Sequence, residues 1–173
     1  NIIKDFQENT LDNLITSYVK NKLPENPQYA NEYIIDIYSN LLDEEKNCAI
    51  NLNSHYMEQQ TEINEQMRAI LIDWIIDVHF KFHFTEETLY MAIHIIDAYL
   101  SLEKIQRVNL QLLGVAALFI SCKHEEIFFP KLNGFAYITD NAYQKDDIIK
   151  MEHEILRTLK FNLIAPSPLK FYE

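Results

Sequence analysis

The stretch Asn109–Glu126, NLQLLGVAALFISCKHEE, decides how the rest of the chain is interpreted. Between Leu110 and Cys122 it has only two polar side chains, Gln111 and Ser121, and it then turns abruptly to the charged sequence KHEE. A helix that is apolar on all sides is normally buried on all sides. Spanning a bilayer takes roughly 17–25 apolar residues, and this run is shorter. The sequence therefore predicts a central buried helix with a charged end.

The composition excludes several classes of protein. The chain has 173 residues, 48% of them hydrophobic, with 2 Gly and 5 Pro, which argues against disorder and against a turn-rich β fold. Lys and Arg number 15 against 26 Asp and Glu, so the formal net charge is -11. Nucleic-acid binding needs a basic surface, and no cluster of Lys or Arg is visible. We expect neither nucleic acid nor membrane among the partners; a basic protein partner is compatible with the charge.

The first 60 residues show two helical patterns and two connecting segments. Residues 2–19 and 29–42 have apolar residues at helical spacing, whereas 20–28 contain two prolines and 43–60 are polar and weakly patterned. We expect residues 1–60 to form a helical extension and linker. Because the first residue is Asn1 rather than Met, we also expect the chain to be a fragment.

Residues 61–165 are expected to form a compact all-α domain of about five helices around the central one. Asn64 is a suitable N-cap for a helix to about Lys81, and Thr85 for the next helix. Asn109 is expected to cap the central helix, in which Gly114 suggests close approach of a neighbouring backbone. Pro130 and Gly134 are expected to break the following stretch. A last helix should run from about Lys145 to Leu159, with Pro166 and Pro168 stopping it.

No enzymatic motif is found. Two glycines cannot build a glycine-rich phosphate loop. His79 and His83 are four residues apart and could share a metal ion on a helix face, but no third ligand is evident, so partly exposed histidines are the expected reading. His124 precedes two glutamates, which we interpret as ordinary charges at a helix end. Cys48 and Cys122 are expected to be free thiols. We expect no catalytic residue, no metal and no cofactor.

Three charged residues lie within apolar stripes, namely Arg68, Asp97 and Glu152. An unpaired buried charge is costly, so such residues are expected to have partners. Arg68 and Asp97 form a candidate structural ion pair between the first two helices of the compact part. Lys123 and Glu152 fall where a helix face could present them to a partner protein.

These residues together resemble the cyclin family, and specifically the box of A- and B-type (mitotic-like) cyclins. The matching segments follow one another in order: MRAILIDW, ETLYMAIHIIDAYLS, LQLLGVAALFISCKHEE, YITDNAY and MEHEILRTLKFNL. Five positions typical of the box correspond to Arg68, Leu71, Asp97, Lys123 and Glu152. The resemblance covers residues 67 to about 166. It implies an all-α cyclin box that acts as a non-enzymatic, activating subunit of a cyclin-dependent Ser/Thr protein kinase.

The resemblance also implies two binding surfaces. The first contacts the kinase near its C helix and contains Lys123, Glu152, Ile120, His124, Leu156, Phe161 and Leu163, with Tyr33 and Ile37 from the preceding helix. The second is a groove that docks RxL motifs of substrates and inhibitors, and it contains Met67, Ile70, Leu71, Trp74, Asp77 and Gln111. Without the resemblance, the groove residues would be read as a plain core stripe.

Two departures from the family pattern are visible. His124 stands where the family usually has an aromatic residue that contributes to the kinase contact, so we expect this contact to pack differently and kinase binding to be sensitive to pH. A- and B-type cyclins also carry a second five-helix box. Residues 166–173 would begin it, so either the sequence is truncated, which we expect, or the protein has a single box. The family implies action in the nucleus and cytoplasm.

Two alternatives remain open from the sequence. Transcription factors of the B type also use cyclin-like boxes, but they need a basic surface for DNA that a net charge of -11 does not supply. A helical metalloenzyme that uses His79 and His83 is the other alternative. A measurement of bound metal would distinguish it.

Overall fold

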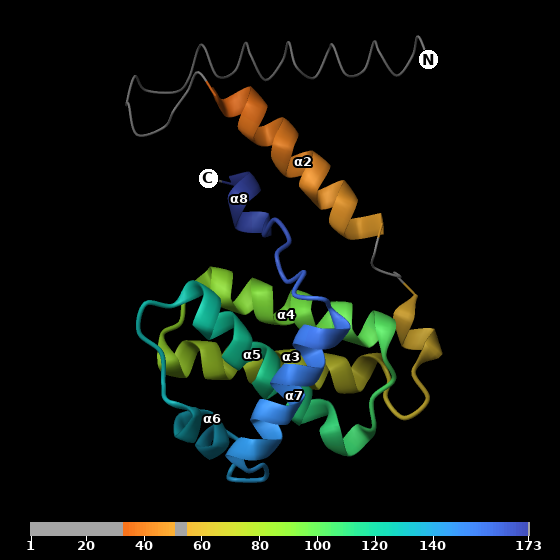
Figure 1. Ribbon diagram of the computed structural model, residues 1–173, viewed down its shortest axis with the longest axis vertical. Helices are drawn as coiled ribbons and strands as arrows, with labels where there is room; N and C mark the ends of the chain where they lie inside the picture. Colours follow the sequence, from red (N-terminus) through yellow and green to blue (C-terminus); the bar gives the residue numbers. More distant parts are fainter. Residues whose placement is uncertain (1–32, 51–54, 173) are drawn as a thin grey trace. The chain divides into compact units, whose positions relative to one another are not determined.

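The computed structural model describes residues 33–50 and 55–172, and within these ranges the regular structure is helical, without a strand (Figure 1). The chain divides into two compact units, Asn1–Asn47 and Cys48–Glu173. The expected helix at 2–19 and the linker at 20–28 lie outside the described residues. No helix in the described part is long and apolar enough to cross a membrane.

Helix α2, Ile34–Ile50, is longer than the sequence predicted. The prediction ended this helix at Leu42 and treated residues 43–60 as a connector, which is wrong for its first part. The segment after Leu42 is polar but contains Glu and Lys, which are good helix formers. Asn40 also donates a hydrogen bond of 3.1 Å to Glu44 one turn later. Intrinsic propensity and a local polar contact therefore continue the helix without an apolar stripe.

The described part of the second unit contains five α-helices of at least seven residues and some shorter helices, coloured from yellow to blue in Figure 1. In chain order they are η3 (Tyr56–Gln59), α3 (Glu65–Phe82), α4 (Glu86–Leu102), η4 (Arg107–Asn109), α5 (Leu110–Glu125), α6 (Leu132–Ile138), α7 (Lys145–Thr158) and α8 (Pro168–Tyr172). The expected all-α fold is confirmed for the described residues.

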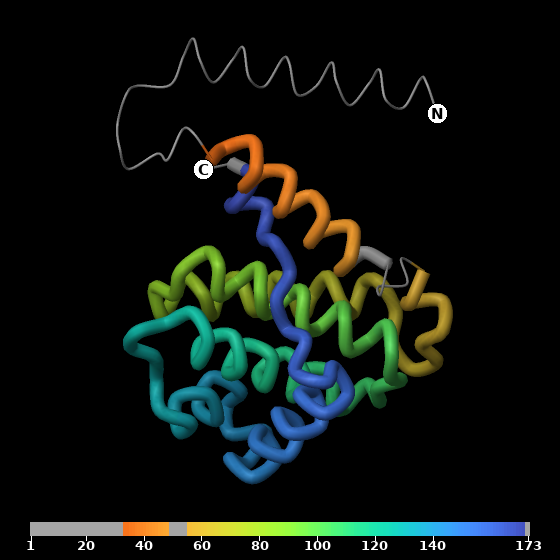
Figure 2. Tube along the Cα trace, turned by 45° about the horizontal axis from the view of Figure 1, so that its top comes forward, coloured from red at the N-terminus to blue at the C-terminus, as the bar shows by residue number. Residues whose placement is uncertain are grey.

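Helix α5 lies at the centre of this unit and contacts α3, α4, α6 and α7 (Figure 1, Figure 2). Every residue from Leu112 to Cys122 is buried, including Ser121, whose hydroxyl donates to the carbonyl of Ala117 at 2.9 Å. The predicted burial on all sides is confirmed. Since the body of α5 is covered, only its ends can meet a partner.

Gly114 allows α3 to pack closely against α5. A Cβ atom at this position would lie 2.7 Å from Cδ1 of Leu71 and 3.3 Å from Cδ1 of Ile75. The close approach expected from the sequence is therefore made by side chains of α3, and not by a neighbouring backbone.

Helices α3, α4 and α5 begin at the predicted N-cap positions, but not every predicted N-cap side chain makes a capping hydrogen bond. Asn64 caps α3 as predicted, because its side chain accepts a hydrogen bond of 3.0 Å from the amide of Met67. Thr85 and Asn109 occupy the predicted cap positions of α4 and α5, yet neither side chain makes a capping hydrogen bond. Helix α7 begins at Lys145 as predicted, with Gln144 and Asp147 forming a capping box.

Two predictions for the segment after α5 are wrong. The stretch expected to be broken by Pro130 and Gly134 contains α6, because Pro130 precedes the helix and Phe135, which is 1% exposed, anchors it in the core. Helix α7 ends at Thr158, close to the predicted end at about Leu159, but the prolines expected to stop it do not do so, because Pro166 lies well beyond this end.

Three helices end in a left-handed residue that is not glycine. His83, Asp140 and Lys160 have φ values of 56°, 57° and 51°. At the end of α7 the amide of Phe161 donates to the carbonyl of Leu156, which is the backbone pattern of a Schellman motif. The same motif closes α3 and α6, where the amides of Phe84 and Asn141 donate to the carbonyls of His79 and Ala136. Glycine is the usual residue at this position, so these three ends lack the usual sequence signal of a helix C-terminus.

We expect Gly114→Val to destabilise the fold by about 1–3 kcal/mol, because a branched side chain would overpack against Leu71 and Ile75. Urea denaturation followed by circular dichroism measures this change. The matched variant Gly114→Ala should be milder, since about 1 kcal/mol of helix propensity offsets its clash. Equal stability of Gly114→Val and the unchanged chain would contradict the close packing.

Candidate functional site

Arg68 of α3 and Asp97 of α4 are joined by two hydrogen bonds. Nε of Arg68 lies 2.7 Å from Oδ1 of Asp97, and Nη2 lies 2.6 Å from Oδ2. Their side chains are 30% and 23% exposed, so the pair is partly shielded from water. The structure thus brings together the two residues expected as a structural pair, and this bidentate geometry holds α3 against α4.

Tyr56 completes this ion pair and was not found from the sequence. Its hydroxyl donates to Oδ1 of Asp97 at 2.7 Å. Burial, together with the Asp97 carboxylate, raises the pKa of Tyr56, so the hydroxyl stays a neutral donor. A tyrosine in a polar connector 41 residues before Asp97 gives no local signal for this contact.

The charged end of α5 meets α7 through Lys123 and Glu152. The ammonium of Lys123 pairs with the carboxylate of Glu152 and lies 4.3 Å above the ring of Phe119. The Glu152 side chain is 9% exposed, whereas that of Lys123 is 38% exposed. The buried carboxylate is therefore held by an ammonium that still faces solvent.

The remaining residues of the expected kinase surface lie in different environments. Phe161 is 73% exposed, and Leu156 and Leu163 are half-buried against the core. Ile120 is 4% exposed and lies inside the core, so the structure does not place it on a surface. Tyr33 and Ile37, which are 55% and 49% exposed, belong to the first unit of the chain.

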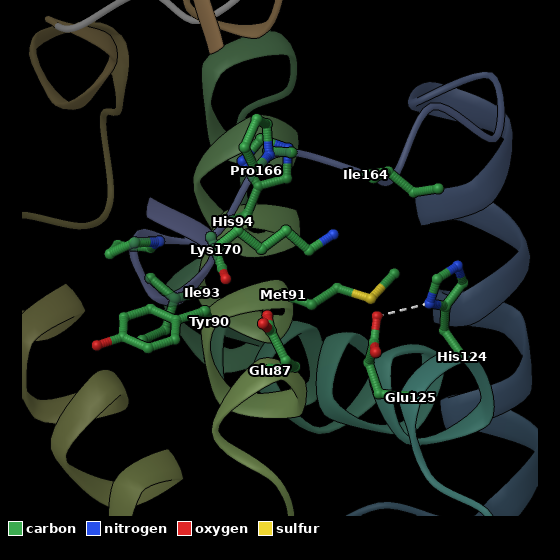
Figure 3. A pocket seen from close by; sticks show the side chains of 13 residues that line it. Glu87, Tyr90, Met91, Ile93, His94, His124, Glu125, Ile164, Pro166 and Lys170 are labelled. Atoms are coloured by element: carbon green, nitrogen blue, oxygen red, sulfur yellow. Dashed lines mark hydrogen bonds and ion pairs between the residues drawn. The ribbon is translucent and has the colours of Figure 1, made fainter. Parts of the chain in front are cut away.

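His124 lies on the wall of a cavity of about 300 Å³ between α4, the end of α5 and residues 164–170 (Figure 3). Its Nδ1 atom is 2.7 Å from Oε1 of Glu125, and its side chain is 43% exposed. Figure 3 shows this pair on one side of the cavity and Met91 of α4 beside it. The residue that departs from the family pattern is therefore held by its own neighbour.

A second hollow, of about 370 Å³, lies between α3 and the start of α5. Of the expected docking residues, the structure brings together Met67, Ile70, Leu71, Trp74 and Gln111, along with Arg107 and Leu110, to line it. Asp77 is exposed on α3 but does not line the hollow. Ile70 is 70% exposed, so this set is not a plain core stripe.

The residues considered for enzymatic chemistry do not form a site. His79 is buried, whereas His83 is the left-handed residue that ends α3, so the two rings do not follow one helix face. Within residues 33–50 and 55–172, no group of three His, Cys, Asp or Glu side chains could hold a metal ion. Cys122 is fully buried, and burial raises the pKa of its thiol to about 12, so it is no nucleophile at neutral pH.

A family model described as the cyclin N-terminal domain matches residues 36–164. The chain belongs to the cyclin family. This match starts earlier than the box expected at 61–165, because it includes most of α2.

Within the family, the chain is similar to mitotic B-type cyclins. It is 49% identical to the G2/mitotic-specific cyclin-B2 of Rana japonica over 146 residues, 84% of this chain and 36% of that protein. Cyclin-B2 of Homo sapiens is 45% identical over 147 residues, 85% of this chain and 36% of that one. Cyclin-B1-1 of Oryza sativa subsp. japonica is 46% identical over 140 residues, 81% and 30% of the two chains. The chain thus spans about a third of the length of these relatives.

The fold is also that of a solved cyclin. The X-ray structure of a viral cyclin from herpesvirus saimiri matches with a TM-score of 0.64 and 23% sequence identity, covering 73% of this chain and 56% of that one. This likeness supports the all-α cyclin fold.

We expect Asp97→Ala to lower the free energy of unfolding by about 1–3 kcal/mol, because it leaves Arg68 and the hydroxyl of Tyr56 without their acceptor. The loss is smaller than for a fully buried pair because water still reaches both side chains. Thermal and urea denaturation measure it. Asp73→Ala, at an exposed position of α3, is the matched control and should change little. Equal effects of the two substitutions would contradict a structural role for the pair.

Proposed function

We propose that this chain is the cyclin part of a regulatory, activating subunit of a cyclin-dependent Ser/Thr protein kinase, acting in mitotic cell-cycle control in the nucleus and cytoplasm. The observation that carries the proposal is the Lys123–Glu152 pair at the end of the buried helix α5, in a chain of the cyclin family. Similarity to mitotic B-type cyclins supports the cell-cycle role.

The pair is suited to a partner's backbone. An ammonium has three hydrogen-bond donors and a carboxylate has about four acceptor sites, so each keeps free capacity after they bind each other. Unpaired backbone carbonyl groups of a partner would suit the ammonium, as at the C-terminus of a helix, and unpaired amide groups would suit the carboxylate, as at an N-terminus. Burial fixes the orientation of Glu152, and the exposed ring of Phe161 adds apolar area close in sequence to the end of α7.

Activation of the kinase would follow from a higher affinity of this chain for the active conformation of the kinase than for the inactive one. A protein kinase is active only when a glutamate of its C helix pairs with the catalytic lysine. A partner that binds this conformation better than the inactive one shifts the population toward it. We infer that the surface around Lys123 and Glu152 supplies this preference, without any catalytic group of its own.

We expect Lys123→Ala to weaken binding of a mitotic cyclin-dependent kinase by roughly 2–5 kcal/mol, since it removes the donor and leaves Glu152 buried without its partner. Isothermal titration calorimetry with the purified kinase measures the affinity. Glu152→Gln, which keeps the shape of the side chain, should also weaken binding.

Lys150→Ala is the matched control, because Lys150 is an exposed lysine on α7. It should bind the kinase as the unchanged chain does. Full affinity of both Lys123→Ala and Glu152→Gln would overturn the assigned surface. Melting temperatures of all variants separate lost contacts from lost folding.

We also propose that the hollow between α3 and the start of α5 docks RxL-type segments of substrates or inhibitors. Ile70 and the half-buried Met67 and Trp74 offer apolar surface for the leucine of such a motif. Gln111 offers an amide for its backbone. Asp77, exposed one helix turn beyond Trp74, is proposed to attract the arginine from outside the hollow.

We expect Ile70→Ala to weaken binding of a synthetic Arg-x-Leu peptide by about 1–2 kcal/mol, because it removes apolar contact area. The melting temperature should hardly change, since Ile70 is 70% exposed. Fluorescence anisotropy with a labelled peptide measures the affinity.

Ile127→Ala is the matched control for this peptide, because Ile127 is 87% exposed and follows the other end of α5. An equal loss for both isoleucine variants, or no loss for Ile70→Ala, would contradict the docking role of the hollow.

A further inference from the structure

Glu126 links the end of α5 to the beginning of α4, and no motif predicted this contact. Its Oε1 atom accepts three hydrogen bonds: 2.6 Å from the amide of Thr85, 3.1 Å from the Thr85 hydroxyl and 2.7 Å from the hydroxyl of Thr88. Thr88 has 0% exposure, so one anchor of Glu126 lies wholly within the protein.

The location explains why a carboxylate is suited to this contact. The first turn of a helix has amide groups without intrahelical partners, and its dipole favours negative charge. Thr85 is the N-cap residue of α4, but its side chain bonds Glu126 rather than the helix backbone. The carboxylate that meets the start of α4 is therefore supplied from 41 residues away, by the C-cap residue of α5.

Glu126 is also tied to the last turn of α5. Its amide donates to the carbonyl of Cys122 at 3.0 Å, and Lys123 is the next residue after Cys122. On the other side, Lys123 pairs with Glu152 of α7. Beyond Glu126 the side chains of Ile127 and Phe128 are 87% and 91% exposed, so they give the segment little support.

The last turn of α5 is thus held from both sides, by α4 through Glu126 and by α7 through Lys123. We propose that Glu126 is a positioning residue for the kinase-binding surface: by holding Thr85 and Thr88 it fixes the place from which Lys123 reaches the kinase. This role rests on the proposed function. It requires no direct contact between Glu126 and the kinase.

The test uses Thr88, because a fully buried side chain cannot touch the kinase. Thr88→Val keeps the shape of the side chain and removes the hydroxyl that Glu126 accepts from. We expect it to weaken kinase binding by up to roughly tenfold, which corresponds to ~1.4 kcal/mol. Thr88→Ser retains the hydroxyl and should restore the affinity.

Thr139→Val is the matched control. Thr139 is 4% exposed, and its hydroxyl donates at 2.8 Å to the carbonyl of Ala136, away from α5. This variant should keep the kinase affinity even if it lowers the melting temperature. Binding of an Arg-x-Leu peptide should be unchanged in Thr88→Val, which separates positioning from general destabilisation.

A double-mutant cycle and hydrogen exchange complete the test. Once Glu126→Ala has removed the acceptor, adding Thr88→Val should cause no further loss of kinase affinity. Glu126→Ala should also speed hydrogen exchange at the Thr85 amide, which loses its acceptor. This second readout does not need the kinase.

The outcomes separate the two proposals. If the unchanged chain binds the kinase and Thr88→Val binds equally well, the positioning role is overturned while the proposed function stands. If Thr88→Ser binds as weakly as Thr88→Val, or if exchange at Thr85 is unaffected by Glu126→Ala, the positioning role is likewise overturned. If the unchanged chain does not bind the kinase, the proposed function fails, and the positioning role fails with it.

Discussion

Burial of α5 on every side is the constraint on which the rest of the structure depends. The helices that contact α5 include α3, α4, α6 and α7, and from Leu112 to Cys122 no side chain is left for a partner. The apolar packing that achieves this has no preferred direction along the helix axis. The ends of α5 must therefore be placed by other interactions, and these are also the parts of the helix that remain available for recognition.

Polar contacts between helices supply this placement. Arg68 joins α3 to α4, Lys123 joins α5 to α7, and Glu126 joins α5 to α4. A hydrogen bond to a charged group has a narrow geometry, so each contact selects one axial position of its helices, whereas apolar surfaces tolerate sliding. Shielding these charged groups from water costs desolvation energy, so we expect each contact to contribute more to specificity than to stability. Our hypothesis for this protein is that apolar burial stabilises the fold and that the polar contacts fix the positions of the helices.

The sequence predicted the features that follow from a local pattern of residues, and it missed contacts between residues that lie far apart in the chain. The buried helix at 110–122 and the cap at Asn64 were predicted, because each has a local pattern. Arg68 and Asp97 could be paired because both are charges within apolar stripes. The contact of Glu126 with Thr85 and Thr88 has no such signal, since a glutamate in a charged run normally faces water. The hollow between α3 and α5 was distinguishable from core only once the exposure of Ile70 was known.

The helix ends that lack glycine affect which substitutions could make the protein more stable. A left-handed backbone costs a residue with a Cβ atom roughly 1 kcal/mol or more, and glycine would avoid that cost at His83 and Lys160. Asp140 and Asn141 tolerate this conformation better than most residues, whereas Phe161, with φ 61°, is a bulky aromatic in the same region. A glycine at Phe161 would relax the backbone but remove the exposed ring. At that one position, evolution toward greater stability and retention of the proposed surface require opposite substitutions.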